Sequence, residues 1–215
     1  MDLKVSGAKI ASLIVSLALI GCLANVASAV SFPEQVDAPD LPLGMSAGTV
    51  PNLTQITGTI SSATDVDMYL ISLPIAGTLA ATTVNMLGTL ADTQLFLFST
   101  AGLGIQANDD PPTSLRAELP GIFLAGGSYL LAISGYNRDP VSVGGLIFPD
   151  TFPGVFGPTG PGGLNPITGW SGTGTTGTYA IDLAFEPVPE PATLLLFGTA
   201  LAGIGAACRR RRRQG

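Results

Sequence analysis

LADTQLFLFSTAGLGIQANDD, residues 90–110, holds two short apolar runs that are separated by glycines, and the second run ends in Asn-Asp-Asp. Runs of this kind, rich in Leu, Phe and Thr and bounded by turn residues, predict β-strands, here at 92–99 and 104–107. Residues 94–98 are apolar on both faces, which is typical of a strand in the middle of a sheet. We therefore expect the core to be built around this strand pair.

The same pattern continues along the chain, and outside the two termini glycines and prolines leave no window of helical length. Six more strands are predicted: 55–60, 66–73, 78–86, 114–119, 128–135 and 178–185. Alternation along two of these strands assigns six residues to a core face: Tyr69, Ile71, Leu73, Tyr129, Leu131 and Ile133. Eight short strands at this spacing predict an all-β fold, a two-sheet sandwich.

The C-terminal segment, residues 187–215, has three parts in a fixed order. Closely spaced prolines at its start favour an extended, exposed strip that an enzyme's groove can bind. Residues 192–208 then carry no charge over 17 positions. As a transmembrane helix this run would span about 25 Å, the short end of what crosses a bilayer core. Five cations follow and would stay on the cytoplasmic side: Arg209, Arg210, Arg211, Arg212 and Arg213.

This order resembles the PEP-CTERM sorting signal of Gram-negative bacteria, whose motif is matched by VPEPAT at 188–193. A plain C-terminal anchor would need only the apolar run and the arginines, and a basic tail alone could be a nucleic-acid arm. The resemblance implies that a membrane-embedded exosortase recognises Val188, Pro189, Glu190 and Pro191. The enzyme would remove the tail from a transient inner-membrane anchor and pass the protein to the cell surface or the medium.

The N-terminal segment, residues 1–29, reads as a secretory signal peptide. Two lysines precede an apolar stretch at 10–20, and Ala27 and Ala29 form an A-x-A site for signal peptidase. A competing site is Cys22, because LIGC resembles a lipobox, in which the cysteine is lipidated and becomes the mature N-terminus. We favour cleavage after the A-x-A site, since a second anchor would be odd on a chain with a sorting tail.

Removal of both terminal segments leaves an acidic chain. Residues 30–187 contain 13 Asp and Glu against Arg116 and Arg138, a net charge of −11, whereas the whole chain has −6. Such a surface repels phosphate backbones and disfavours nucleic-acid binding. The chain has no histidine, and Cys22 and Cys208 both fall in the terminal segments. These counts exclude Ser–His–Asp and Cys–His catalysis and His- or Cys-ligated metals, and leave carboxylate chemistry and oxygen-ligand metals.

Acidic side chains gather at the ends of predicted strands, where they could converge on one rim of a sandwich and hold Ca²⁺ through oxygen ligands. The candidate ligands are Asp65, Asp67, Asp92, Asn108, Asp109 and Asp110. The alternative is that each side chain caps its own turn by bonding to nearby backbone. No D-x-D-x-D-G loop occurs in the sequence, so calcium is a candidate cofactor and no cofactor is required.

Three segments are similar to the bacterial pre-peptidase C-terminal domain: DVDMYLISL at 65–73, residues 90–110, and LAGGSYLLAISGY at 124–136. The leader at 37–60 resembles the version found in secreted proteins with this tail. The resemblance implies a non-catalytic, jelly-roll-like β-sandwich, and some relatives bind calcium or polymers such as collagen and polysaccharide. The expected order is a signal peptide at 1–29, an extended leader at 30–54, the sandwich at 55–186 and the sorting signal at 187–215.

Residues 137–177 depart from the resemblance as an insert dense in Gly and Pro, and at about forty residues they are too long for an ordinary loop. A further strand is expected near 144–148. The insert contains four large aromatic residues: Phe148, Phe152, Phe156 and Trp170. They could line a ligand-binding loop, or they could protect a sheet edge and fill the core; we favour the second interpretation.

Three functions fit the sequence. The first, which we favour, is an exported, non-catalytic surface or extracellular-matrix protein associated with exopolysaccharide or biofilm. The second is an envelope lipoprotein anchored through Cys22. The third is a carboxylate hydrolase, but Asp109 and Asp110 are adjacent and would point to opposite faces of a strand. The chain's single tryptophan also offers little surface for stacking on sugars.

Overall fold

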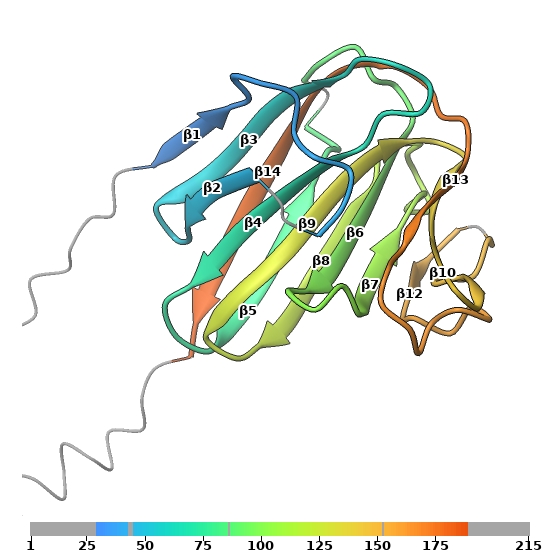
Figure 1. Ribbon diagram of the computed structural model, residues 1–215. Coiled ribbons are helices and arrows are strands. Elements are labelled where there is room, and N and C mark those ends of the chain that lie inside the picture. Colours follow the sequence, from blue (N-terminus) through green and yellow to red (C-terminus); the bar gives the residue numbers. More distant parts are fainter. Residues whose placement is uncertain (1–28, 43–44, 86, 152, 189–215) are drawn as a thin grey trace, which may run out of the picture.

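The computed structural model describes residues 29–42, 45–85, 87–151 and 153–188, and these residues form fourteen strands. The described part of the chain is all-β, a sandwich of two sheets with a small third sheet at one side (Figure 1). Within it there is no helix with the length and hydropathy needed to cross a bilayer. The predicted signal helix, apart from Ala29, and the predicted transmembrane helix at 192–208 lie outside the described residues.

The sandwich consists of a five-stranded and a six-stranded sheet. The five-stranded sheet has the order β1 (Val30–Pro33), β3 (Leu53–Ile60), β14 (Gly177–Pro187), β5 (Gly77–Thr82), β8 (Glu118–Leu124). The six-stranded sheet has the order β12 (Val155–Phe156), β7 (Gly104–Asn108), β6 (Thr93–Ser99), β9 (Gly127–Gly135), β4 (Asp67–Leu73), β2 (Met45–Thr49). The third sheet has the order β11 (Gly145–Leu146), β10 (Arg138–Ser142), β13 (Gly169–Gly172).

The strands predicted at 92–99 and 104–107 are present as β6 and β7, and β6 lies inside the six-stranded sheet as predicted. Side chains alternate along β4, β6 and β9, so that each strand contributes to two separate clusters of buried residues. The cluster between the two sheets contains Tyr69, Ile71, Leu73, Leu95, Leu97, Leu131 and Ile133. The cluster on the outer face of the six-stranded sheet contains Met68, Phe96, Phe98, Leu130 and Ala132.

The strand predicted at 114–119 is wrong in position, because the structure has β8 at Glu118–Leu124. Pro120 and Gly121, which normally interrupt strands, lie inside it. They are accommodated because β8 is an edge strand. One side of an edge strand has no neighbouring strand, so a proline there removes no hydrogen bond of the sheet. The pairing with β5 also shifts register between Leu79 and Ala81 next to this site.

Residues 30–54, expected as an extended leader before the first strand, belong to the sandwich instead. β1 pairs in parallel with β3 in one sheet, and β2 pairs in parallel with β4 in the other. Both are edge strands, so the leader covers one open edge of each sheet. The small residues of β2, Met-Ser-Ala-Gly-Thr, carry little strand propensity, and for that reason the sequence did not indicate it.

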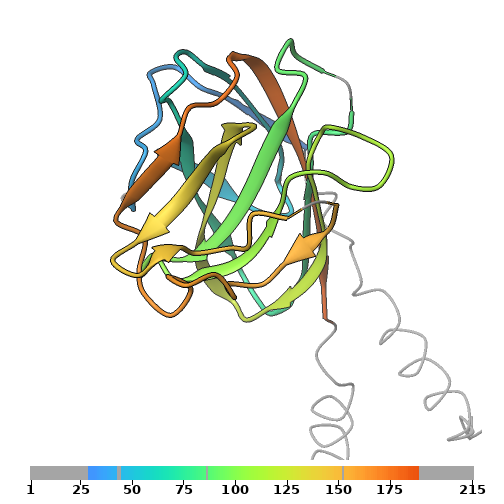
Figure 2. The ribbon, with the colours of Figure 1, turned by 90° about the vertical axis from the view of Figure 1, so that its right-hand side faces the viewer.

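The insert at 137–177 packs against the outer face of the six-stranded sheet (Figure 2). Phe148 is 5% exposed, and its ring centroid lies 5.8 Å from those of Phe96 and Phe98. The Trp170 ring also contacts both of these phenylalanines, and its Nε1 donates to the Asp40 carbonyl at 2.6 Å. These contacts agree with the core-filling interpretation for Phe148 and Trp170.

The same insert also protects a sheet edge. Its strand β12, which contains Phe156, pairs with the outer side of β7. The strand expected near 144–148 is present as the short β11, and Phe152 lies outside the described residues. Both parts of the favoured interpretation, edge protection and core filling, therefore have contacts that support them.

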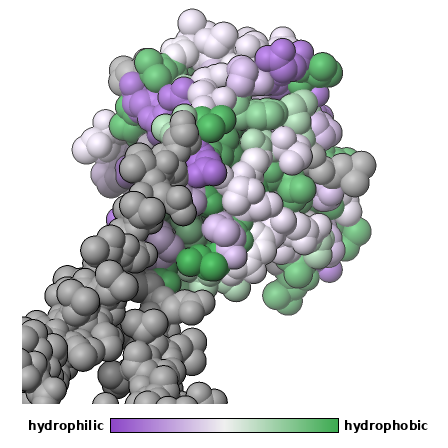
Figure 3. Space-filling view, turned by 90° about the vertical axis from the view of Figure 1, so that its left-hand side faces the viewer, coloured by the Kyte–Doolittle hydropathy of each residue, from purple (hydrophilic) through white to green (hydrophobic). Residues whose placement is uncertain are grey.

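Strand directions define two opposite rims of the sandwich. β1 is parallel to β3 and β14 is antiparallel to it, so β1 begins and β14 ends at the same rim, here named the terminal rim (Figure 1). At the other rim β3, β7 and β9 end while β4 and β6 begin. We name this second rim the acidic rim, because the aspartates predicted as ligands lie there. Figure 3 looks onto the side of the sandwich where β1 and β2 lie in Figure 1, and there hydrophobic residues form separate patches among hydrophilic ones, as is usual for a surface in water.

Candidate functional site

The six predicted ligand residues all lie at the acidic rim, but they do not form one site. Asp67 lies with Glu34 and Asp37, and Asp92 lies with Asp109 and Asp110. In each group of three, one carboxylate oxygen per residue lies within 4.8 Å of those of the other two. We name these groups the leader cluster and the strand-end cluster.

The other two predicted ligands, Asp65 and Asn108, have local structural roles. One carboxylate oxygen of Asp65 accepts a hydrogen bond from the Ser61 backbone N–H. The Asn108 side chain accepts from the Glu118 N–H at 2.7 Å and donates to the Gly154 carbonyl at 2.7 Å. Asp65 therefore bonds close to its own turn, as the turn-capping alternative expects, whereas Asn108 joins segments that are distant in the sequence.

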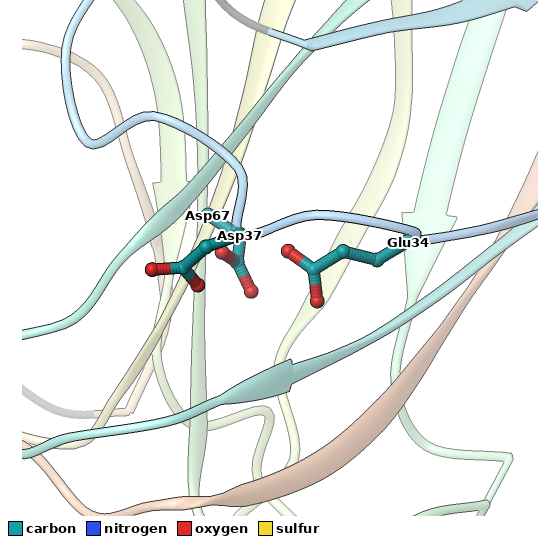
Figure 4. Close-up of side chains that lie close together, drawn as sticks. All are labelled: Glu34, Asp37 and Asp67. Carbon is teal, nitrogen blue, oxygen red and sulfur yellow. The ribbon is translucent and has the colours of Figure 1, made fainter.

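The leader cluster joins the residues after β1 to the first residue of β4 (Figure 4). The two Glu34 carboxylate oxygens accept from the backbone N–H groups of Ala38 and Thr59, each at 2.9 Å. Asp67 is fully buried, and its Oδ2 accepts from the Tyr179 hydroxyl at 2.6 Å. Three of the six carboxylate oxygens of this cluster are therefore bonded to protein donors.

Burial, together with the smaller effect of the negative charges of Glu34 and Asp65, raises the pKa of Asp67 to about 9, although the Tyr179 hydrogen bond opposes this shift. Asp67 is therefore a neutral acid at pH 7 and belongs to a hydrogen-bond network that continues from Tyr179 to the Tyr69 hydroxyl. Sequence reasoning missed Glu34 and Asp37, because it placed the leader outside the sandwich. The only available signal was their position just after the apolar VSF segment of β1.

The strand-end cluster joins the residue before β6 to the two residues after β7. Asp109 is 8% exposed. In the strand-end cluster, four buried carboxylate oxygens have no hydrogen-bond partner among the residues that the structure describes: Asp92 Oδ1, Asp109 Oδ1, Asp109 Oδ2 and Asp110 Oδ1. Buried polar atoms in folded proteins are almost always paired, so this concentration marks the strand-end cluster as the candidate site.

The charges around the strand-end cluster are negative. Burial, followed by the smaller effects of the carboxylates of Asp110, Asp92, Asp139 and Asp150, raises the pKa of Asp109 to about 8. Burial, followed by Asp110, also raises the pKa of Asp92. The two arginines of the described ranges donate to backbone carbonyls elsewhere: Arg116 to Leu87 and Gly88, and Arg138 to Thr64, Trp170 and Gly172.

The sorting segment begins where the sandwich ends. β14 is the middle strand of the five-stranded sheet and ends at Pro187, and the Val188 N–H still donates to the Ala76 carbonyl at 3.1 Å. The Val188 side chain is 47% exposed. The remaining residues predicted for sorting and anchoring, Pro189, Glu190, Pro191 and the five arginines at 209–213, lie outside the described residues, as does Ala27 of the predicted cleavage site.

Fold and tail together define an all-β protein whose last strand leads directly into an export signal. Residues 187–212 match the PEP-CTERM protein-sorting motif. The protein is thus exported, held for a time by a C-terminal membrane anchor and then delivered to the cell surface or the extracellular space, and exosortase is its processing enzyme.

Comparison with solved structures gives distant similarities. The pre-peptidase C-terminal domain of a collagenase from Bacillus anthracis is 10% identical, with a TM-score of 0.35, over 73% of this chain and 96% of that domain. The periplasmic inhibitor of g-type lysozyme PliG from Salmonella Typhimurium is 16% identical, with a TM-score of 0.30, over 66% of this chain and all of the inhibitor. No curated protein matches the sequence.

Proposed function

We propose that the protein is a non-catalytic component of the cell surface or extracellular matrix, associated with exopolysaccharide or biofilm. The observation that carries this proposal is the position of the sorting motif, which starts at residue 187, where the last strand ends. Removal of the tail by exosortase would leave every strand of the sandwich in place. The domain that reaches the surface would then be a complete fold with its own core.

Composition supports the same proposal. Residues 30–187 carry 13 acidic side chains and two arginines, and they contain neither cysteine nor histidine. A high negative charge favours solubility outside the cell. Matrix association needs exposed loops and no catalytic group, and both rims of the sandwich present such loops. In this proposal signal peptidase cleaves after Ala29, and the delivered protein begins at Val30.

A hydrolase is the weaker candidate, although the raised pKa of Asp109 is a property of catalytic acids. The carboxylates of Asp92, Asp109 and Asp110 have oxygens within 4.8 Å of one another. Glycosidases separate their two carboxyl groups by roughly 5–5.5 Å or 6.5–9.5 Å, with room for the sugar between them. Asp109 is 8% exposed, so its carboxylate has little access to a substrate.

Replacement of Glu190 by alanine should keep the protein in the inner membrane, because exosortase would lose the acidic side chain of its recognition strip. The measurement is the distribution of the protein between inner membrane, cell surface and medium, in cells that express the wild type or the variant. Glu186→Ala is the matched control, since it removes an exposed glutamate four residues earlier on β14. Unchanged release of Glu190→Ala would contradict processing at this motif.

Mass spectrometry of the delivered protein separates secretion from lipid anchoring. We expect an N-terminus at Val30 and a C-terminus that lacks the arginine cluster at 209–213. A diacylated Cys22 at the N-terminus would instead establish the envelope-lipoprotein alternative. In that case the same sandwich would stay attached to a membrane surface.

A further inference from the structure

We propose that Asp92, Asp109 and Asp110 form a Ca²⁺ site that closes the acidic rim of the sandwich. The observation behind the proposal is the set of four buried carboxylate oxygens that no donor of the described residues satisfies. Asp109 is the central residue, because it is 8% exposed and both of its oxygens belong to this set.

The geometry of the strand-end cluster suits calcium. Ca²⁺ binds oxygen ligands at about 2.3–2.6 Å, so two ligands of one ion lie at most about 5 Å apart. One oxygen from each of the three aspartates lies within 4.8 Å of the other two. Three carboxylates that crowd together with neither a cation nor a hydrogen-bond donor are unfavourable. A divalent cation would reduce the repulsion between the carboxylates and would also give their buried oxygens a partner.

The leader cluster offers a contrast within the same rim. Both Glu34 oxygens are bonded to backbone N–H groups, and Asp67 Oδ2 is bonded to Tyr179. Asp67 Oδ1 is the one oxygen of that cluster that is buried and unpartnered within the described ranges. Protein donors therefore satisfy both Glu34 oxygens and one Asp67 oxygen there, whereas four buried oxygens of the strand-end cluster have no such donor in the described ranges.

The donor set and the compartment both select calcium. The three side chains supply only carboxylate oxygens, which are ligands for hard cations rather than for zinc or copper. Mg²⁺ demands near-ideal octahedral geometry and gives up water reluctantly, whereas Ca²⁺ accepts irregular oxygen sites. Extracellular modules bind Ca²⁺ with Kd values of roughly 0.1–1 mM, and the sorting motif delivers this protein to that environment.

A bound ion would hold several segments together. The Asp92 carbonyl accepts from the Tyr136 N–H and from Thr175 Oγ1, each at 3.3 Å; Tyr136 lies just before the insert and Thr175 lies near its end. The Asp110 carbonyl accepts from the Gly154 N–H at 3.1 Å, which lies next to β12 inside the insert. Calcium at the three side chains would therefore fix the ends of β6 and β7 and, through these backbone bonds, the insert that covers the sheet.

The test is thermal unfolding of the purified full-length protein in mild detergent, with EDTA or with 10 mM CaCl₂. For a Kd of roughly 0.1–1 mM we expect CaCl₂ to raise the Tm by about 3–10 °C, and MgCl₂ or NaCl of equal ionic strength to raise it less. Isothermal titration calorimetry should give one Ca²⁺ per chain. Asp92→Asn and Asp109→Asn should lose both the shift in Tm and the binding heat.

Asp67→Asn is the matched control, because it makes the same substitution at another buried aspartate on the same rim and should keep the full response to calcium. In EDTA the Asp109→Asn variant should have a Tm at least as high as the wild type, since it relieves repulsion, and this result shows that it folds. The proposal is overturned if the wild type shows neither shift nor binding heat. It is equally overturned if both strand-end variants keep the response, or if Asp67→Asn alone abolishes it.

Discussion

Phe148→Ala should lower the free energy of unfolding by about 3–5 kcal/mol, the range for truncating a buried phenylalanine in a packed core. Phe148 is 5% exposed and contacts the rings of Phe96 and Phe98, which project from the outer face of β6. Its loss would leave a cavity between the insert and the six-stranded sheet. We also expect a protease to cleave within 137–177 faster in the variant than in the wild type.

Urea unfolding followed by circular dichroism, together with limited proteolysis, measures both effects. Phe123→Ala is the control, because Phe123 is 63% exposed on the edge strand β8 and its truncation should change stability by less than about 1 kcal/mol. A loss for Phe148→Ala as small as that of the control would mean that the ring does not support the fold. The aromatic ligand-binding loop would then be the better interpretation of the insert.

Asp67→Asn should make the protein less sensitive to alkaline pH. Between pH 5 and pH 8 the free energy of unfolding of the variant should increase relative to that of the wild type by as much as about 4 kcal/mol. The folded-state pKa of Asp67 is raised from 3.8 to about 9, chiefly by burial. From about pH 4 to about pH 9 the folded wild type therefore holds a proton that the unfolded chain has lost. Stability must fall as pH rises through this window, and asparagine, which is uncharged, removes this contribution.

Denaturant midpoints of the wild type and of Asp67→Asn, measured in EDTA at pH 5 and pH 8, test this expectation. EDTA excludes any effect of calcium, and the comparison of the two proteins cancels the titration of Asp109. Glu186→Gln, at an exposed position of β14, should follow the wild type at both values. A constant difference between wild type and Asp67→Asn at the two pH values would show that Asp67 is ionised in the folded state.

Most of the fold could be predicted because period-2 alternation and turn residues are local signals. All eight predicted strands overlap observed ones, including the central β6, although the strand predicted at 114–119 shares only residues 118–119 with β8. The position predicted for β8 was wrong because a strand tolerates Pro120 only at the edge of a sheet. Whether a strand lies at an edge is a property of the assembled fold and cannot be read from the local sequence. β1 and β2 were missed for a related reason, because both are short and contain Pro33 or Gly48, and their parallel pairing with β3 and β4 is a property of the assembled fold.

The candidate site could be predicted only in outline. Strand ends placed Asp67, Asp92 and Asp109 on one rim, and the structure has them there. Which of them share a cluster depends on sheet order, because β4 and β6 are separated by β9. The sequence also could not tell that Asn108 bonds to Glu118 and Gly154, since those segments are brought next to it by tertiary packing.

The end of β14 at Pro187 limits how far the folded domain can stand from the bilayer before the tail is cut. Four residues, 188–191, separate this strand from the predicted apolar run, and four extended residues reach at most about 14 Å. Exosortase would then work in a gap barely wider than a single helix, next to the terminal rim of the sandwich. The acidic rim, at the far end of the sandwich, would meanwhile face away from the lipid and meet the ions and polymers of the surroundings first.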